Sequence, residues 1–206
     1  MRKTFTALFL ALFSISIAFS QDTLTAGQVL GKAVSLITQA KGIETKFTVT
    51  NSGFSGGGLI KASGKKFKVI MPDVEVWYNG KDLYTYSKRS GETTVVVPTT
   101  EELSQSNPLA YVTGASGNYN VKFSTVKKTG KYVLELTPKQ KSSEIKRITL
   151  TLNKTDYTPQ KIVVEPASGT PITSEISSFQ TSKAINDSEF NYPKSKYPNV
   201  EIIDLR

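Results

Sequence analysis

The chain has 206 residues, contains no Cys and no His, and carries a formal net charge of +9 at pH 7. Without Cys and His it lacks the usual zinc ligands, a thiolate nucleophile and the commonest general base, which disfavours an enzyme. Its basic residues are scattered over predicted strands and turns and form no nucleic-acid-binding motif, so we interpret them as a solvated surface and expect no nucleic-acid partner. Attraction to an acidic partner or to an anionic lipid surface is the alternative.

The start of the chain has the pattern of an export signal. Arg2 and Lys3 precede an apolar run at residues 5–19, and a small residue, Ser20, ends the segment. This pattern predicts a secretory signal peptide at residues 1–20, cleaved near Ser20, and a periplasmic location for the mature protein. A single membrane anchor is the alternative, although the apolar run is shorter than the ~20 residues that a membrane span needs.

The mature chain, beginning near Gln21, is long enough for one domain with a sizeable core, so we expect a single domain at residues 21–206. With Arg2 and Lys3 removed, 24 Lys and Arg residues against 17 Asp and Glu residues leave a net charge of +7. Since an exported chain can form disulfides and this one has no Cys, its core must hold the fold by packing.

A helix is predicted at the start of the mature chain. Thr25 and Gln28 have the spacing of a capping box, and apolar residues recur at helical spacing from Val29 to Ala40. Gly42 supplies the stop. The helix therefore has one apolar face that must pack against another element.

Strand patterns occupy most of the remaining chain. From Ile43 the apolar period changes to two, and residues 67–98 have the pattern of four short strands separated by turn residues. Asn79 and Gly80 tolerate the positive φ of a tight hairpin turn, so the segments VEVWY and LYTYS are predicted to be antiparallel neighbours. Further strands are expected at residues 43–50, 59–63, 119–126, 132–137, 145–153, 160–165, 172–181 and 200–205.

Residues 99–113 interrupt the strands with two short helical turns. Thr99 and Glu102 have the spacing of a second capping box, and Asn107 with Pro108 provides a cap and a proline at the first helical position. We therefore expect a short helical insert that is apolar on one side.

Together these elements predict an α+β domain with one strongly curved antiparallel sheet of about ten or eleven strands, an incomplete β-barrel, because a single sheet of this length curls. The N-terminal helix and the central insert are the elements available to close its concave face as a lid. They are too small for a full second layer, so a cavity lined by aliphatic and aromatic side chains is expected, which indicates an apolar ligand. A solid core is the alternative.

Six short motifs occur in a characteristic order along the mature chain. They are GLI at residues 58–60, FKVIMP at 67–72, NGKDLYTY at 79–86, NPL at 107–109, YVLELTPK at 132–139 and FNYPK at 190–194. In this order they resemble the LolA-like family of periplasmic outer-membrane lipoprotein carriers. The resemblance implies a half-barrel whose hydrophobic cavity shields the acyl chains of lipoproteins. It also implies an inner-membrane ABC transporter as donor and an outer-membrane acceptor, without catalysis or a cofactor, and we expect a monomer.

The side chains expected to line the cavity are apolar residues of the sheet and the lid. On the sheet they are Phe47, Val49, Leu59, Phe67, Val69, Met71, Val76 and Leu134, and on the lid they are Val34, Ile37, Leu109 and Val112. Between residues 74 and 86 the register is open, since Val76 and Trp77 point to opposite faces and only the face of Val76 is consistently apolar.

The chain departs from the family pattern at one position. LolA-like carriers usually have an Arg just before the strand that corresponds to residues 67–71, and that Arg ties the lid to the sheet. Here Ser63 and Gly64 occupy the aligned positions, with Lys65 and Lys66 nearby. A weaker or differently latched lid is therefore expected.

Other functional classes stay open. A domain of the same fold could bind a protein partner through an exposed sheet edge, without lipid cargo. S-x-x-K at residues 63–66, S-x-N at 116–118 and K-T-G at 128–130 follow the order of penicillin-recognising serine enzymes, but they lie in predicted turns, so ordinary polar turns are favoured. Likewise Trp77 and Tyr84 could stack on sugars or bases, although core packing is favoured.

Overall fold

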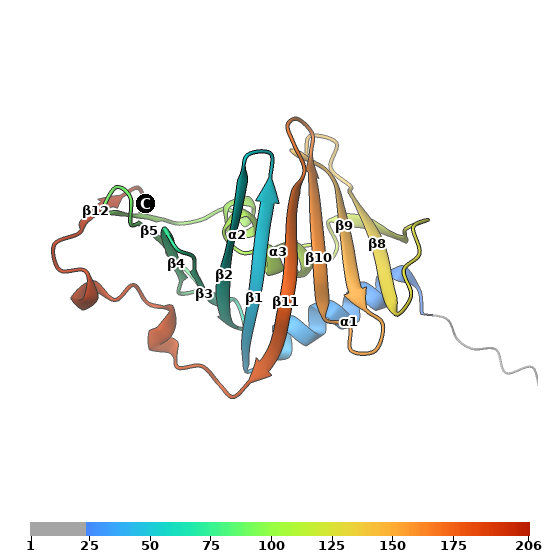
Figure 1. Ribbon diagram of the computed structural model, residues 1–206, viewed down its shortest axis with the longest axis horizontal. Coiled ribbons are helices and arrows are strands. Elements are labelled where there is room, and N and C mark those ends of the chain that lie inside the picture. Colours follow the sequence, from blue (N-terminus) through green and yellow to red (C-terminus); the bar gives the residue numbers. More distant parts are fainter. Residues whose placement is uncertain (1–23) are drawn as a thin grey trace, which may run out of the picture.

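The structure is a computed structural model that describes residues 24–206, so the predicted signal peptide and its cleavage near Ser20 and Gln21 lie outside the described residues. Twelve strands form one sheet, and three α-helices lie against one of its faces (Figure 1). The predicted α+β class with one curved, unclosed sheet is confirmed, with twelve strands in place of about ten or eleven. Within the described residues no helix is long and apolar enough to span a membrane.

The helices interrupt two long runs of strands. The helical elements are α1 (Ala26–Gln39), α2 (Thr100–Ser106), α3 (Pro108–Thr113) and two 3-10 helices, η1 (Asp187–Phe190) and η2 (Lys194–Lys196). The strands are β1 (Gly42–Asn51), β2 (Phe54–Ser63), β3 (Lys66–Ile70), β4 (Val74–Tyr78), β5 (Leu83–Ser87), β6 (Glu92–Val96), β7 (Tyr119–Phe123), β8 (Lys131–Pro138), β9 (Ile145–Asn153), β10 (Pro159–Pro166), β11 (Ile172–Ser182) and β12 (Glu201–Asp204).

The sheet consists of two meanders joined in the middle. β1 to β6 pair in sequence order, β7 to β11 do the same, and β1 pairs with β11. All neighbours are antiparallel except β12, which runs parallel to β6. The full order is β12-β6-β5-β4-β3-β2-β1-β11-β10-β9-β8-β7, so β7 and β12 are the two open edges.

The helices begin where the capping patterns predict. At the start of α1, the side chain of Thr25 accepts a hydrogen bond from the N–H of Gln28, and the Gln28 side chain accepts one from the N–H of Thr25. Thr99 and Glu102 form the same reciprocal pair at the start of α2. Asn107 caps α3 through its side chain. Local hydrogen bonds therefore fix all three starting points.

The hairpin between β4 and β5 forms as predicted, with a different turn. The two strands pair from Val74–Ser87 to Tyr78–Leu83, so residues 79–82 make the connection. Gly80 has φ +99°, whereas Asn79 uses its side chain, which accepts hydrogen bonds from the N–H groups of Lys81 and Asp82. Of the two residues expected at positive φ, only the glycine adopts it.

The concave face carries the helices and holds the main hydrophobic core. α3 packs against both α1 and α2, and α1 also lies against β7 and β8. The helix α1 turns one apolar stripe to the sheet, consisting of Ala26, Val29, Leu30, Ala33 and Ile37. This stripe and the inward side chains of the strands form one continuous cluster.

A second buried cluster lies on the opposite face, beneath the C-terminal segment that runs from β11 to β12. Trp77 and Phe190 are fully buried there, yet neither belongs to the main core. The Trp77 ring meets the ring of Tyr192 edge to face at 5.4 Å, and Tyr192 stacks on Tyr84 at 5.3 Å. The Tyr197 hydroxyl lies 3.0 Å from a carboxylate oxygen of Glu75, to which it donates.

This outer cluster decides the open register of β4. Val76 pairs with Val69 on the concave face, and Trp77 lies on the outer face, where the C-terminal segment shields it from water. Both faces of β4 are therefore buried. Trp77 and Tyr84 pack against aromatic rings of the same chain, as the core-packing interpretation predicted.

Phe190→Ala should detach the C-terminal segment from the outer face. Loss of a fully buried ring is expected to lower the free energy of unfolding by about 3–5 kcal/mol, because the transfer and cavity terms add. Urea unfolding followed by Trp77 fluorescence measures it. As a control, Val126→Ala removes a side chain that is 59% exposed and should stay within about 0.5 kcal/mol. Equal effects of the two substitutions on the free energy of unfolding would contradict the role of Phe190 in holding the C-terminal segment.

Candidate ligand-binding site between the helices and the sheet

Eleven of the twelve residues expected to line a cavity lie between the helices and the concave face. These belong to the main core cluster or pack against it. Buried members are Ile37, Phe47, Phe67, Val69, Val76, Leu109, Val112 and Leu134, and partly buried members are Val34, Val49 and Met71. The structure thus brings together side chains from α1, α3, four strands (β1, β3, β4 and β8) and the turn after β3 on one apolar surface.

Leu59 is the exception, and its expected place on the cavity wall is wrong. It pairs with Lys46 on β1 and Ile70 on β3, which point to the outer face, whereas its neighbour Ile60 pairs with Thr45 and is fully buried. Both residues are apolar, so the sequence pattern did not decide between them. A shift of one position along a strand turns a side chain to the opposite face.

The core residues pack on one another in this conformation. The residues that line the two pockets described below include none of the twelve expected wall residues. The solid-core alternative therefore describes the structure as it stands, with the helices closed on the sheet.

Glycines of β2 allow a close approach on the concave face near the β1–β2 turn. A Cβ at Gly58 would lie 2.5 Å from the carbonyl oxygen of Ile70 and 3.1 Å from the ring of Phe47. A Cβ at Gly56 would lie 2.7 Å from the ring of Phe54, which is 51% exposed. These glycines belong to the strand, which begins at Phe54 and not at residue 59 as expected. They leave room for apolar rings at the rim of the core.

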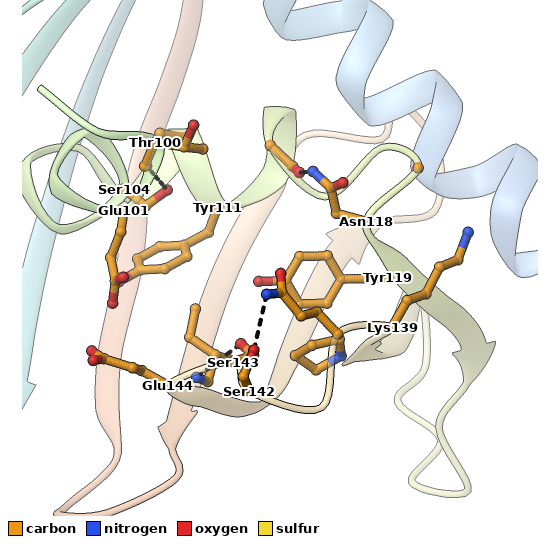
Figure 2. A pocket seen from close by; sticks show the side chains of 16 residues that line it. Thr100, Glu101, Ser104, Tyr111, Asn118, Tyr119, Lys139, Ser142, Ser143 and Glu144 are labelled. Atoms are coloured by element: carbon orange, nitrogen blue, oxygen red, sulfur yellow. Dashed lines mark hydrogen bonds between the residues drawn. The ribbon is translucent and has the colours of Figure 1, made fainter.

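A pocket of about 580 Å³ opens at the edge of the helical layer, between α2 and α3 on one side and the β8–β9 turn on the other (Figure 2). Tyr111 of α3 and Tyr119 of β7 are half-buried and line it, together with Glu101 of α2 and Glu144 of the turn. Its remaining lining residues are Thr100, Ser104, Ala110, Gly114, Gly117, Asn118, Pro138, Lys139, Gln140, Ser142, Ser143 and Ile145.

The carboxyl of Glu101 is perturbed by its surroundings in this pocket. Partial burial, and then the neighbouring Glu144 carboxyl, raise the pKa of Glu101 above its ordinary value. The adjacent Glu102 differs, because its hydrogen bonds with the backbone and the hydroxyl of Thr99 lower its pKa. Burial and the charge of Glu101 raise the pKa of Tyr111 and Tyr119, so both rings are neutral phenols at pH 7.

Sequence reasoning missed this pocket. Glu101 directly precedes Glu102 of the predicted capping box, but it meets Glu144, which comes from a distant turn. The acidic residue that precedes β9 offered no periodic or motif signal. Only the fold brings the two together.

A second pocket, of about 750 Å³, follows the outer side of α1. It is lined by Leu24 and Leu36 of the helical region and by Tyr157 of the β9–β10 turn. Tyr157 has φ +62°, and the ammonium group of Lys32 lies 5.1 Å from its ring centre. This groove runs along α1 beside the β9–β10 turn, and Leu24 and Tyr157 also pack against the core.

LolA-like carriers usually have an Arg just before β3. In this chain the polar residues at and near that position contact elements other than the short helices α2 and α3. The Ser63 hydroxyl donates to the carbonyl of Lys41 at 3.0 Å, and Lys66 forms an ion pair with Asp187 of η1 at 2.6 Å. This turn therefore holds the C-terminal segment. Ser63 is the last residue of β2, Ser116 lies in the turn after α3 and Lys128 lies in the loop after β7, so the three motifs belong to separate connections between elements.

A pH titration can test the pocket electrostatics. The side-chain carboxyl of Glu101 should titrate above its ordinary value of 4.5, and that of Glu102 below it. Because the folded-state pKa of Glu101 exceeds its unfolded value, its charged form opposes folding at neutral pH, and the effect disappears as the pH falls below 4.5. Carbon-detected NMR measures both midpoints. Glu144→Gln should lower the Glu101 midpoint only, and equal midpoints for Glu101 and Glu102 would refute this arrangement.

Comparison with solved structures shows where this fold occurs. An uncharacterized conserved protein from Thermus thermophilus superposes with a TM-score of 0.59 at 10% identity, over 86% of this chain and 98% of that chain, which shows a shared fold. A LolA superfamily protein from Nitrosomonas europaea matches with a TM-score of 0.45 at 14% identity, over 82% and 99% of the two chains. A putative outer membrane lipoprotein-sorting protein domain from Vibrio parahaemolyticus gives 0.45 at 13%, over 82% and 96%.

Sequence comparison identifies the family. No curated protein matches the chain. The family described as "Outer membrane lipoprotein carrier protein LolA" matches residues 16–167, which is most of the chain. The expected resemblance is thereby confirmed, and the chain belongs to the LolA family of outer membrane lipoprotein carrier proteins.

Proposed function

We propose that the protein is a non-catalytic periplasmic carrier that shields the acyl chains of lipoproteins, or of a related lipid, between its sheet and its helices. The observation that carries the proposal is the concave apolar face, which within residues 24–206 is covered by three helices, two of which are six or seven residues long. Family membership supports it. Donation by an inner-membrane ABC transporter, transfer to an outer-membrane acceptor and a monomeric state belong to the same proposal.

Acyl binding requires the helices to move, because their side chains fill the space. Leu109 and Val112 of α3 are fully buried against the core. An incoming chain would replace these contacts with its own at about 0.8 kcal/mol per buried methylene, so the exchange of one apolar surface for another need not be costly. Release would follow when a membrane acceptor covers the chain better. No bond is made or broken, so no catalytic group is needed.

The residues expected to line the cavity would have two different roles in the binding and release of an acyl chain. Sheet residues such as Phe67, Val69 and Val76 would form the fixed wall, since each belongs to a strand paired on both sides. Residues of α1 and α3 would form the movable wall. Leu59 has no role in it, because it lies on the outer face.

A specific observation favours a second candidate, the binding of a protein partner at a sheet edge. In the part of the chain that the structure describes, β7 is an edge strand that pairs with β8 alone. Ser124 donates its N–H to the carbonyl of Val133 in β8, so by strand alternation the N–H groups of Val121 and Phe123 point away from the sheet. An extended segment of another protein could add a strand there.

Leu109→Ala should speed acyl uptake. Removing a fully buried leucine lowers the stability of the closed form by about 2–5 kcal/mol and so raises the population in which α3 has left the sheet. Stopped-flow fluorescence of an environment-sensitive fatty-acid probe measures the rate. Val97→Ala, at a side chain that is 57% exposed, is the matched control and should leave it unchanged. Failure of both the wild-type protein and the variant to take up the probe would refute the carrier function.

Val121→Pro separates the two candidates. Proline removes an N–H that points outward and leaves the bonds to β8 in place, so the fold should persist while strand addition at β7 is blocked. Probe uptake should remain within about twofold of the wild-type value if the protein is a carrier. Absence of probe uptake by the wild-type protein and the variant alike, together with loss of a co-purifying protein from the variant, would favour the edge-binding candidate. Circular dichroism confirms the fold of the variant.

A further inference from the structure

The pocket between α2, α3 and the β8–β9 turn presents two acidic side chains in a basic protein. Among the described residues, no ion pair joins Glu101 or Glu144 to a Lys or Arg, whereas carboxylates such as Glu165 and Glu175 have such partners. Lys139 also lines the pocket, but its ammonium group extends away from the two carboxylates (Figure 2). The pocket therefore has uncompensated negative charge where the chain as a whole is positive.

Two aromatic side chains line the pocket together with these carboxylates. Tyr111 and Tyr119 present half-buried rings to the pocket, and both phenols lie near enough to Glu101 for its charge to raise their pKa. A neutral aromatic face attracts a cation, and a nearby carboxylate adds to that attraction. Rings combined with carboxylates suit an ammonium group better than a metal ion. No group of three or more acidic or metal-binding side chains with metal-site spacing occurs among the described residues.

The pocket also borders the core. Tyr111, Tyr119 and Ile145 line it and at the same time pack against the main hydrophobic cluster. A chain held between the helices and the sheet could reach the pocket past these three side chains. The volume of about 580 Å³ lies within the range of small-ligand sites.

We infer that this pocket binds the ammonium headgroup of a lipid whose acyl chain lies between the helices and the sheet. The inference rests on the proposed function, since it names the headgroup class of the cargo. A primary or quaternary ammonium would sit against the adjacent carboxylates of Glu101 and Glu144 and the ring of Tyr111. The headgroup would thereby select cargo that the apolar core cannot distinguish.

The test compares two amphiphiles with the same chain, decyltrimethylammonium and decyl maltoside, both below their micelle concentrations. Calorimetry on the mature protein should show about tenfold tighter binding of the cation, against its net positive charge, since an ion pair and a cation–π contact add. Glu101→Gln/Glu144→Gln should abolish this preference and leave the binding of the maltoside unchanged.

The control double variant is Glu44→Gln/Glu201→Gln. It changes the net charge equally, at two carboxylates for which the described residues contain no ion pair and which lie outside the pocket. It should keep the preference. If both amphiphiles bind the wild-type protein equally, or both double variants lose the preference alike, the inference is overturned and the carrier function stands.

A second measurement covers the case in which neither amphiphile binds, which would refute the carrier function itself. Tetramethylammonium has no acyl chain and probes the pocket alone. NMR should show shifts of the Tyr111 and Tyr119 ring signals that saturate with its concentration in the wild-type protein and vanish in Glu101→Gln/Glu144→Gln. Absence of these shifts overturns the inference independently of acyl binding.

Discussion

Alternation of side chains along each strand is the constraint on which this structure depends. In β4, Val76 faces the helices and Trp77 faces the opposite side, and both are buried. One sheet therefore has two apolar faces that need cover. The helices cover the concave face, and the C-terminal segment covers part of the outer face through Phe190 and Tyr192. The two faces are covered by different kinds of structure. Three helices pack on one face, and a mostly irregular segment packs on the other.

The sequence was most informative where structure depends on near neighbours. The capping boxes at Thr25 and Thr99 and the hairpin at Gly80 were predicted because each needs only residues within a few positions. The face of Leu59 was predicted wrongly because its neighbour Ile60 is equally apolar, so alternation gave two consistent registers. The role of Phe190 escaped notice because its burial depends on a strand far away in the chain.

The same distinction applies to the site. Apolar periodicity located the wall of the core, because a buried face leaves a repeated pattern in each strand. It could not reveal whether the helices stand open or closed, since that depends on how well side chains from different elements fill the space. The pocket with Glu101 and Glu144 leaves no pattern either, because its two carboxylates come from a helix and a turn that are far apart in the sequence. Two charged residues that come together only in the folded chain can be recognised as a pair only when the fold is known.

The joint between the two meanders has a consequence for how the chain folds. Within each meander, strands that follow in sequence also pair, so each can form from local contacts. β1 and β11 instead join residues as distant as Thr45 and Ser178, which are 133 positions apart and linked by a hydrogen bond. Contacts of such long separation form slowly, because closing the intervening loop costs entropy. We therefore expect two half-sheets to assemble first and their union at β1 and β11 to limit the folding rate.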